Sequence, residues 1–337
     1  MRRQALIPFA PVSPRTSAIL GWGSFLLPLL LWSAFSYLPF LWHPMVSIQD
    51  PGDVSFATPG QLIDRKVLAA ENARVEAAGG RPATGPRANP VFLPAPHEVA
   101  TAFVRAFTTP PRRANEMWFH QNLLHSIRII ALGFFWSSVF GVPIGILCGV
   151  YSATSRLTEP VVDFIRYMPE PAFGALAVAI LGIHDAPKVA IIFIGTFFQQ
   201  ILVVANTTRK MDVALLEAAQ TLGARPRHLL GKVVLPGIAP DLYNDMRILL
   251  GWAWTYLVVA EYIGASSGIT FFINQQARFR NYDNVFAAIL IIGIIGFTTD
   301  RLLDDLRLAI FPWKSNGRRA VIFRFLCRKS KPAVPAV

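Results

Sequence analysis

Residues 124–151 read LHSIRIIALGFFWSSVFGVPIGILCGVY, and Arg128 is the only side chain in this run that is charged at neutral pH. A membrane core about 30 Å thick is crossed by about 20 helical residues, so the run is long enough to span it. It lacks the ten-residue alternation of a membrane β-barrel strand. The segment therefore predicts a membrane-spanning α-helix.

Five further segments support the same prediction: 18–41, 161–183, 189–205, 242–264 and 285–299. A short polar connection, residues 184–188, separates two of them, which predicts a helical hairpin. Apolar residues make up 53% of the chain and charged residues 15%, whereas soluble domains average about 25% charged. We therefore predict an all-α integral membrane protein with six transmembrane helices. A soluble enzyme and a disordered chain do not fit this composition.

Lysine and arginine are distributed unevenly around these segments. Residues 207–241 carry five bases against three acids, and residues 300–337 carry nine against three, whereas residues 43–121 carry eight against seven. Because cytoplasmic loops are enriched in Lys and Arg, both termini are expected in the cytoplasm. The predicted organisation has five parts. Residues 1–17 form a cytoplasmic tail, residues 18–41 a first transmembrane helix that is too long for a signal peptide, and residues 42–121 an extracytoplasmic excursion. Residues 122–311 form a core domain and residues 312–337 a basic cytoplasmic tail.

The basic C-terminal tail has two interpretations. Anionic lipid headgroups attract clusters of this kind next to a transmembrane helix, and we favour that partner over nucleic acid. The cluster comprises Arg318, Arg319, Arg324, Arg328, Lys329 and Lys331.

The excursion is too long for an ordinary loop. Residues 61–78 and 98–107 have helical spacing of apolar side chains, and the proline-rich segment 79–96 between them predicts a stiff, extended stretch. Two roles remain open: the excursion covers the outer faces of the helices, or it contacts an external partner.

Small residues recur every four positions in the second predicted helix. Such a stripe lets two helix backbones approach closely in a membrane. It indicates a helix buried in a bundle or at a subunit interface. The stripe comprises Gly133, Ser137, Gly141, Gly145 and Gly149.

Polar residues within the apolar segments are candidates for a pore or a gate. Glu170 lies between Pro169 and Pro171, where the helical hydrogen-bond ladder must break, and Gln199 lies in the fourth segment. The alternatives are that Glu170 braces irregular backbone and that Gln199 forms an interhelical hydrogen bond.

Glu261 near the end of the fifth segment is followed by small residues that include Gly264, Ser266 and Ser267. Residues 264–279 predict a short helix that folds back toward the bundle. We expect an outer gate here, with Glu261 accepting hydrogen bonds that brace the turn. Ser266 and Ser267 are gate candidates with it.

The chain shows no catalytic constellation. It contains two cysteines, no CxxC pair and no GxxxxGK[ST] phosphate loop, so neither a metal site nor an ATP site is expected in this chain. A dense series of ionisable residues across the helices, as in many ion-coupled carriers, is also absent. A secondary transporter remains the alternative class, and a membrane-embedded enzyme is a third.

Residues 211–240 read MDVALLEAAQTLGARPRHLLGKVVLPGIAP. Asp212 can cap a helix, Gly223 suits the left-handed position that ends it, and Pro226 suits the first turn of a second helix that Pro236 would stop. The pattern predicts a two-helix knob on the cytoplasmic side. Either a partner docks on the knob or it packs as a plain loop.

The knob resembles the EAA motif of ABC importer permeases, which reads EAA, three residues, G, nine residues, I, one residue, LP. The matching residues are Glu217, Ala218, Ala219, Gly223, Val233, Leu235 and Pro236, with Val233 in place of the usual isoleucine. Residues 93–313 resemble permeases for nitrate, taurine, alkanesulfonate and bicarbonate. Two features depart from that family: the segment MPEPAFGALA around Glu170, and the long excursion at residues 43–92.

The resemblance implies a type I, MetI-like permease fold in a two-fold dimer in the bacterial inner membrane. In such a system the EAA residues contact separate ATPase subunits, which bind ATP and Mg. An extracytoplasmic solute-binding protein delivers the cargo. The expected function is to form the pathway for a small anionic solute.

Overall fold

The computed structural model describes residues 13–38, 41–111, 116–263 and 267–314 of the chain. The chain divides into two compact units. Unit 1 comprises residues 1–109 and 275–289, and unit 2 comprises residues 110–274 and 290–337. Ser266, a predicted gate residue, lies outside the described part of the chain.

Unit 1 begins with helix α1 (Pro14–Tyr37), whose first turn is capped by the hydroxyl of Ser13. Helix α3 (Pro96–Thr108) contains the predicted helical segment 98–107, and Glu98 accepts a 2.7 Å hydrogen bond from the Ala95 amide at its start. The Trp32 indole of α1 donates to the Pro94 carbonyl at 3.0 Å. This bond ties the first helix to the segment that leads into α3.

The excursion in unit 1 has its own small core. Strands β1 (Met45–Ser47), β2 (Leu62–Asp64) and β3 (Arg87–Ala88) form an antiparallel sheet in the order β2-β1-β3. Helix α2 (Arg65–Ala77) follows β2 directly. The apolar side chains between these elements are buried: Val46, Ile48, Val54, Ala57, Ile63, Leu68 and Ala83.

The sequence prediction for this segment was partly wrong. A helix over 61–78 was expected, but residues 62–64 pair with β1, and the Asp64 carboxylate accepts from the Lys66 amide at 2.8 Å to cap a helix that starts only at Arg65. The segment 79–96 was expected to be extended throughout, but β3 and the Thr84 bridge to Asp50 fold it back onto the sheet.

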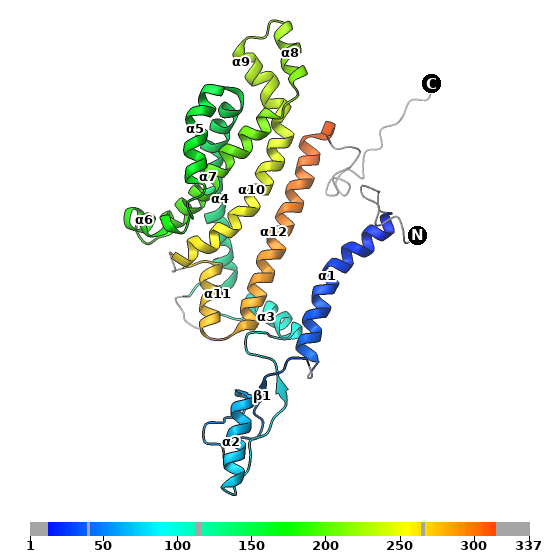
Figure 1. Cartoon of the computed structure of the whole chain (residues 1–337), viewed down its shortest axis with the longest axis vertical. Helices are drawn as coiled ribbons and strands as arrows, with labels where there is room; N and C mark the ends of the chain where they lie inside the picture. The colour runs from blue at the N-terminus through cyan, green and yellow to red at the C-terminus, as the bar shows by residue number, and fades with distance from the viewer. Residues whose placement is uncertain (1–12, 39–40, 112–115, 264–266, 315–337) are drawn as a thin grey trace. The chain divides into compact units, whose positions relative to one another are not determined.

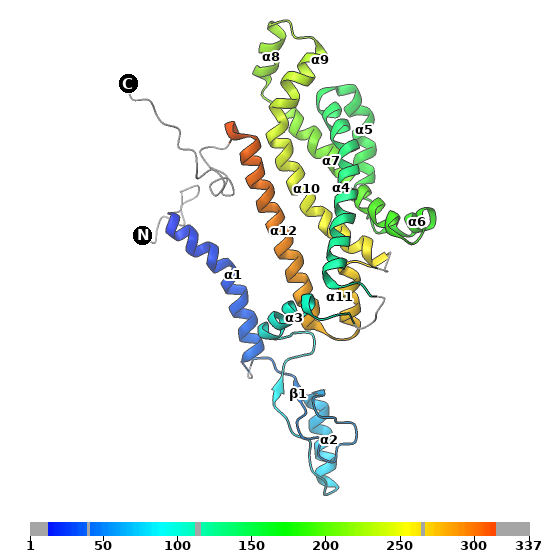
Figure 2. The same ribbon diagram turned by 180° about the vertical axis from the view of Figure 1, so that it is seen from behind.

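Unit 2 is a helical bundle built on α4 (Phe119–Val150), α7 (Asp185–Arg209) and α10 (Leu235–Ile263). Helix α8 (Val213–Thr221) lies at one end of it and the start of α11 (Ile269–Arg278) at the other (Figures 1 and 2). We call these the α8 end and the α11 end. Helix α12 (Tyr282–Ile310) begins in unit 1 and continues in unit 2, where a short 3-10 turn (Pro312–Lys314) follows it.

The glycine stripe of α4 lies against α7. A Cβ atom at Gly133 would stand 2.7 Å from Ile192 Cβ, and one at Gly141 would stand 3.0 Å from Gln200 Oε1. Gly149 is similarly close to Thr208. The two backbones therefore approach as closely as the stripe predicts, and side chains at these positions would separate them.

The third predicted span is not one helix. Helix α5 (Ser152–Ile165) ends before Pro169, and α6 (Ala172–Leu181) begins after Pro171. Neither proline has an amide hydrogen to donate, so the helical ladder cannot continue through this segment. An irregular stretch that contains Glu170 results.

Among the described residues, four helices are long and apolar enough to cross a membrane by length and composition: α1, α4, α7 and α12. Helix α10 is of similar length, but its first half carries Asp241, Asp245 and Arg247. The count of six spans, with α5 and α6 together forming the third, stays a prediction.

Candidate functional site

The start of α11 is held by side chains from two other helices. The amides of Gly268, Ile269 and Thr270 donate to Asn122 Oδ1, Ser126 Oγ and Glu261 Oε2 at 2.9, 2.9 and 2.8 Å. The first amides of a helix have no partner within it, so these three bonds satisfy groups that would otherwise be buried and unpaired. Gly268 has φ +111°, a backbone angle that favours glycine.

Glu261 is fully buried at the centre of this arrangement. One of its oxygens accepts from the Ser126 hydroxyl and the other from the Thr270 amide. These are the bracing hydrogen bonds that the sequence led us to expect. The role of the segment as an outer gate stays a prediction.

A second polar cluster adjoins the first at the α11 end. The ammonium group of Lys188 is fully buried and lies 3.1 Å from Ser267 Oγ, 3.4 Å from the Ser267 carbonyl and 3.4 Å from Asp185 Oδ1. His125 Nε2 lies 3.0 Å from the same Asp185 oxygen and 3.1 Å from Ser267 Oγ. Ser267, a predicted gate residue, is therefore the meeting point of α4, α7 and the start of α11.

Sequence reasoning missed most of these residues. Lys188 was assigned to a loop because the apolar run starts at Val189, although α7 begins at Asp185 and buries it. Asn122 and Ser126 are spaced i, i+4, so they lie on one face of α4 beside the glycine stripe. That spacing was the available signal for a polar site.

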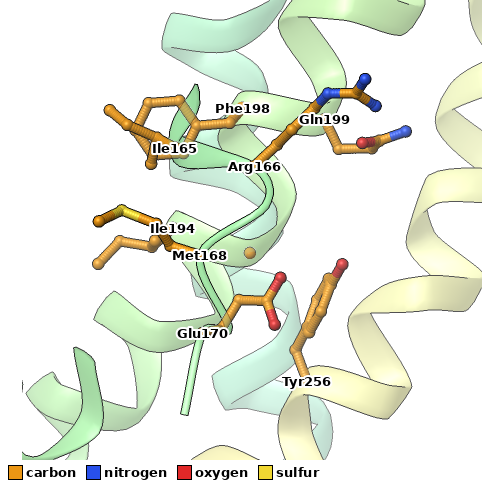
Figure 3. A pocket seen from close by; sticks show the side chains of 9 residues that line it. Ile165, Arg166, Met168, Glu170, Ile194, Phe198, Gln199 and Tyr256 are labelled. Atoms are coloured by element: carbon orange, nitrogen blue, oxygen red, sulfur yellow. The ribbon is translucent and has the colours of Figure 1, made fainter. Parts of the chain in front are cut away.

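Glu170 and Gln199 lie together at a small cavity of about 30 Å³ beside the break between α5 and α6 (Figure 3). The Glu170 carboxylate points toward Tyr256 of α10. Gly195 of α7 makes room for both, because a Cβ there would stand 3.0 Å from the Tyr256 ring and 3.1 Å from Glu170 Cγ. The cavity has room for water but not for a larger solute.

At the α8 end, a two-helix knob follows α7 as predicted. Asp212 accepts from the Ala214 amide at 2.9 Å to cap α8, and Gly223 has φ +76° just after it. Leu216 packs against the buried cluster around Val234 and Ile238. Glu217 and Ala218 are exposed and Ala219 is half-buried.

The second knob helix does not stop at Pro236 as expected. Helix α9 (Pro226–His228) continues through a π-helical segment (Leu229–Val234) directly into α10. The wider turn relieves the clash that a proline ring makes with the carbonyl four residues earlier, so the helix runs on through Pro236. Val233 thus belongs to the π segment, and Leu235 and Pro236 belong to the start of the long helix.

Comparison with known proteins identifies relatives for most of unit 2. Residues 141–307 match the family described as binding-protein-dependent transport system inner membrane component. The chain is 32% identical over 196 residues to a probable ABC transporter permease protein of Brucella abortus, covering 58% of this chain and 78% of that protein. It is 30% identical over 225 residues to the taurine transport system permease protein TauC of Escherichia coli, covering 67% and 81% of the two chains.

A bicarbonate transport system permease protein of Synechococcus elongatus is 25% identical over 179 residues, covering 53% of this chain and 64% of that one. Among solved structures, the MetNI methionine ABC transporter aligns with a TM-score of 0.53 at 20% identity, covering 59% of this chain and 99% of that one. This likeness concerns the fold alone.

Proposed function

Because this chain belongs to the family of inner-membrane permease components of binding-protein-dependent ABC transport systems, we propose that it forms the pathway for a small anionic solute. Relatives named for taurine, aliphatic sulfonates and bicarbonate support a small sulfonate or an inorganic oxyanion as cargo. The observation that carries the proposal is a bundle with an exposed knob at one end and the small polar cavity beside the break between α5 and α6.

Separate ATPase subunits supply the energy in this proposal, and the knob is their contact. Leu222, Val213 and Leu215, in α8 and at its C-terminal end, are 89%, 59% and 52% exposed. Exposed apolar groups next to a free carboxylate, Glu217, suit a surface that a protein partner covers. Bound ATP and Mg belong to that partner.

The orientation follows from charge. Residues 207–241, which contain the knob, carry five bases against three acids, and this balance favours the cytoplasm. The α8 end then faces the ATPase, the α11 end faces outward, and both termini are cytoplasmic. A solute-binding protein approaches the α11 end.

The small polar cavity at the break between α5 and α6 faces the pathway in this proposal. Gln199 lies 14 residues after the start of the 25-residue helix α7, about 21 Å along it and therefore near mid-depth. Glu170, Gln199 and Tyr256 are only partly buried within unit 2. Polar groups at this depth are costly against lipid, so they face water or a second copy of the chain. In a two-fold homodimer with the pathway between the copies, these polar groups face the water-filled pathway and the second copy instead of lipid.

The experiment is transport in proteoliposomes that contain the permease, its ATPase and its binding protein. Sulfonates, nitrate and bicarbonate are each offered with and without ATP. The proposal expects uptake of at least one of these anions that requires ATP and the binding protein. Uptake driven by an ion gradient without ATP would instead identify a secondary transporter.

A further inference from the structure

Asp185 is the surface-exposed member of the polar cluster at the α11 end. It is the first residue of α7, and its side chain is 47% exposed, whereas the side chain of Lys188 is fully buried and that of His125 is 16% exposed. Both of these residues contact the same Asp185 oxygen, Oδ1. The half-exposed carboxylate is thus in reach of a molecule outside the protein.

From Asp185 a continuous series of polar contacts leads to the start of α11. Lys188 and His125 each touch Asp185 on one side and Ser267 on the other. The next residue, Gly268, is bonded to Asn122 on α4. A change at the Asp185 carboxylate therefore reaches the backbone that begins α11 through two side chains.

The carboxylates of the cluster differ in exposure. Four elements contribute to it: His125 comes from α4, Asp185 and Lys188 from α7, Glu261 from α10, and Ser267 and Thr270 from the start of α11. Lys188 and Glu261 are both fully buried, whereas the Asp185 side chain is 47% exposed. Asp185 is therefore the carboxylate of this cluster that a cation from outside the protein can reach.

We propose that Asp185 is a docking contact for the solute-binding protein, and that it receives a lysine or arginine side chain of that protein. The proposal rests on the function proposed above, in which the binding protein approaches the α11 end. An incoming cation competes with Lys188 for Oδ1. The Lys188 contact is the longer of the two, at 3.4 Å, and Lys188 retains the Ser267 hydroxyl and carbonyl as partners when it is displaced. Docking thereby loosens one of the contacts that hold the start of α11.

The test compares Asp185→Asn with His184→Asn in the reconstituted complex of permease and ATPase. Both changes introduce the same side chain at adjacent positions at the start of α7, but only the first removes the negative charge. ATP hydrolysis is measured against a concentration series of solute-loaded binding protein. For Asp185→Asn, the concentration for half-maximal stimulation should rise about threefold to fivefold, the loss typical of one exposed ion pair. The shift should shrink as salt is added.

Asp185→Glu, which keeps the charge, should restore stimulation to near the wild-type concentration. Equal half-maximal concentrations for Asp185→Asn and His184→Asn would overturn the proposal. An Asp185→Asn protein that fails to fold is recognised by loss of its basal ATP hydrolysis. In that case, a Cys at position 184, next to the intact Asp185, carries a photoreactive cross-linker, and absence of a cross-link to the binding protein overturns the proposal. If the wild-type complex shows no stimulation at all, the proposed function fails rather than the assignment of Asp185.

Discussion

Gly145 of α4 lies directly against Val204 of α7, so that a Cβ atom on the glycine would stand 2.7 Å from Val204 Cβ and 2.8 Å from the Ile201 carbonyl oxygen. Both neighbours are fixed, one by its branching at Cβ and the other by the α7 backbone. A single methyl group at this position must therefore push the two helices apart.

We expect Gly145→Ala to destabilise the protein by about 1–3 kcal/mol, the usual cost of overpacking a close interface. Thermal unfolding of the purified protein in detergent measures it. The matched control is Gly251→Ala on α10, where a new Cβ meets nothing within 4 Å. Alanine is the better helix former, so the control should be neutral or slightly stabilising. Equal melting temperatures for the two variants would show that the stripe does not set the helix spacing.

Glu261 gives a second prediction, because it is an acceptor for Ser126 and Thr270. Glu261→Ala leaves these buried donors without a partner, at a cost of about 1–3 kcal/mol each, and should reduce both stability and transport. Glu261→Gln keeps an acceptor oxygen and should retain transport. Parallel uptake assays with the two variants make the comparison. Equal damage from Gln and Ala would mean that the negative charge matters, and the bracing role would be wrong.

The orientation gives a third prediction. Single cysteines are placed at the exposed positions Glu76 and Arg227 after the native Cys148 and Cys327 have been replaced. A membrane-impermeant thiol reagent applied from outside should label position 76 and leave position 227 unlabelled until the membrane is opened. Labelling of position 227 in intact cells contradicts the topology.

The pathway gives a fourth prediction. Gln199 lines the mid-depth cavity without being buried, whereas its neighbour Gln200 is buried and donates to Ser138 at 3.2 Å. Gln199→Leu should lower solute uptake several-fold and leave the melting temperature nearly unchanged. Gln200→Leu should mainly lower the melting temperature, because it removes an interhelical hydrogen bond. Uptake that is unaffected by Gln199→Leu would remove this residue from the pathway.

These residues show which features the sequence can predict. Long helices follow from apolar runs, and the knob follows from local capping signals such as Asp212 and Gly223, because each depends on residues close together in the chain. The contacts of Lys188 join α7 to residues 79 positions later, and no local pattern predicts such a pairing. The same holds for Ser126 and Glu261, which are 135 positions apart.

Two of the sequence predictions were wrong for local reasons. The strands of the excursion are only two or three residues long, which is too short to show the alternation of apolar and polar residues typical of a strand. The predicted helix therefore included the residues of β2 as well as those of α2. Pro236 is a strong stop signal in an ordinary α-helix, but the preceding π-helical turn removes the steric reason for the stop.

The last prediction concerns the knob, where Gly223 sets the angle between α8 and α9 through its φ of +76°. Leucine at this position is strained, at a cost of about 1–2 kcal/mol, because its Cβ disfavours left-handed backbone, whereas asparagine adopts that conformation more readily. We therefore expect Gly223→Leu to weaken ATPase association and transport, and Gly223→Asn to retain both.

Glu217→Ala should also lose coupling to the ATPase, because Glu217 is exposed on α8, whereas folding of the bundle should be unaffected. Co-purification of the ATPase with each variant, together with uptake and the melting temperature, separates coupling from folding. Normal co-purification and uptake for both Glu217→Ala and Gly223→Leu would show that the ATPase docks elsewhere.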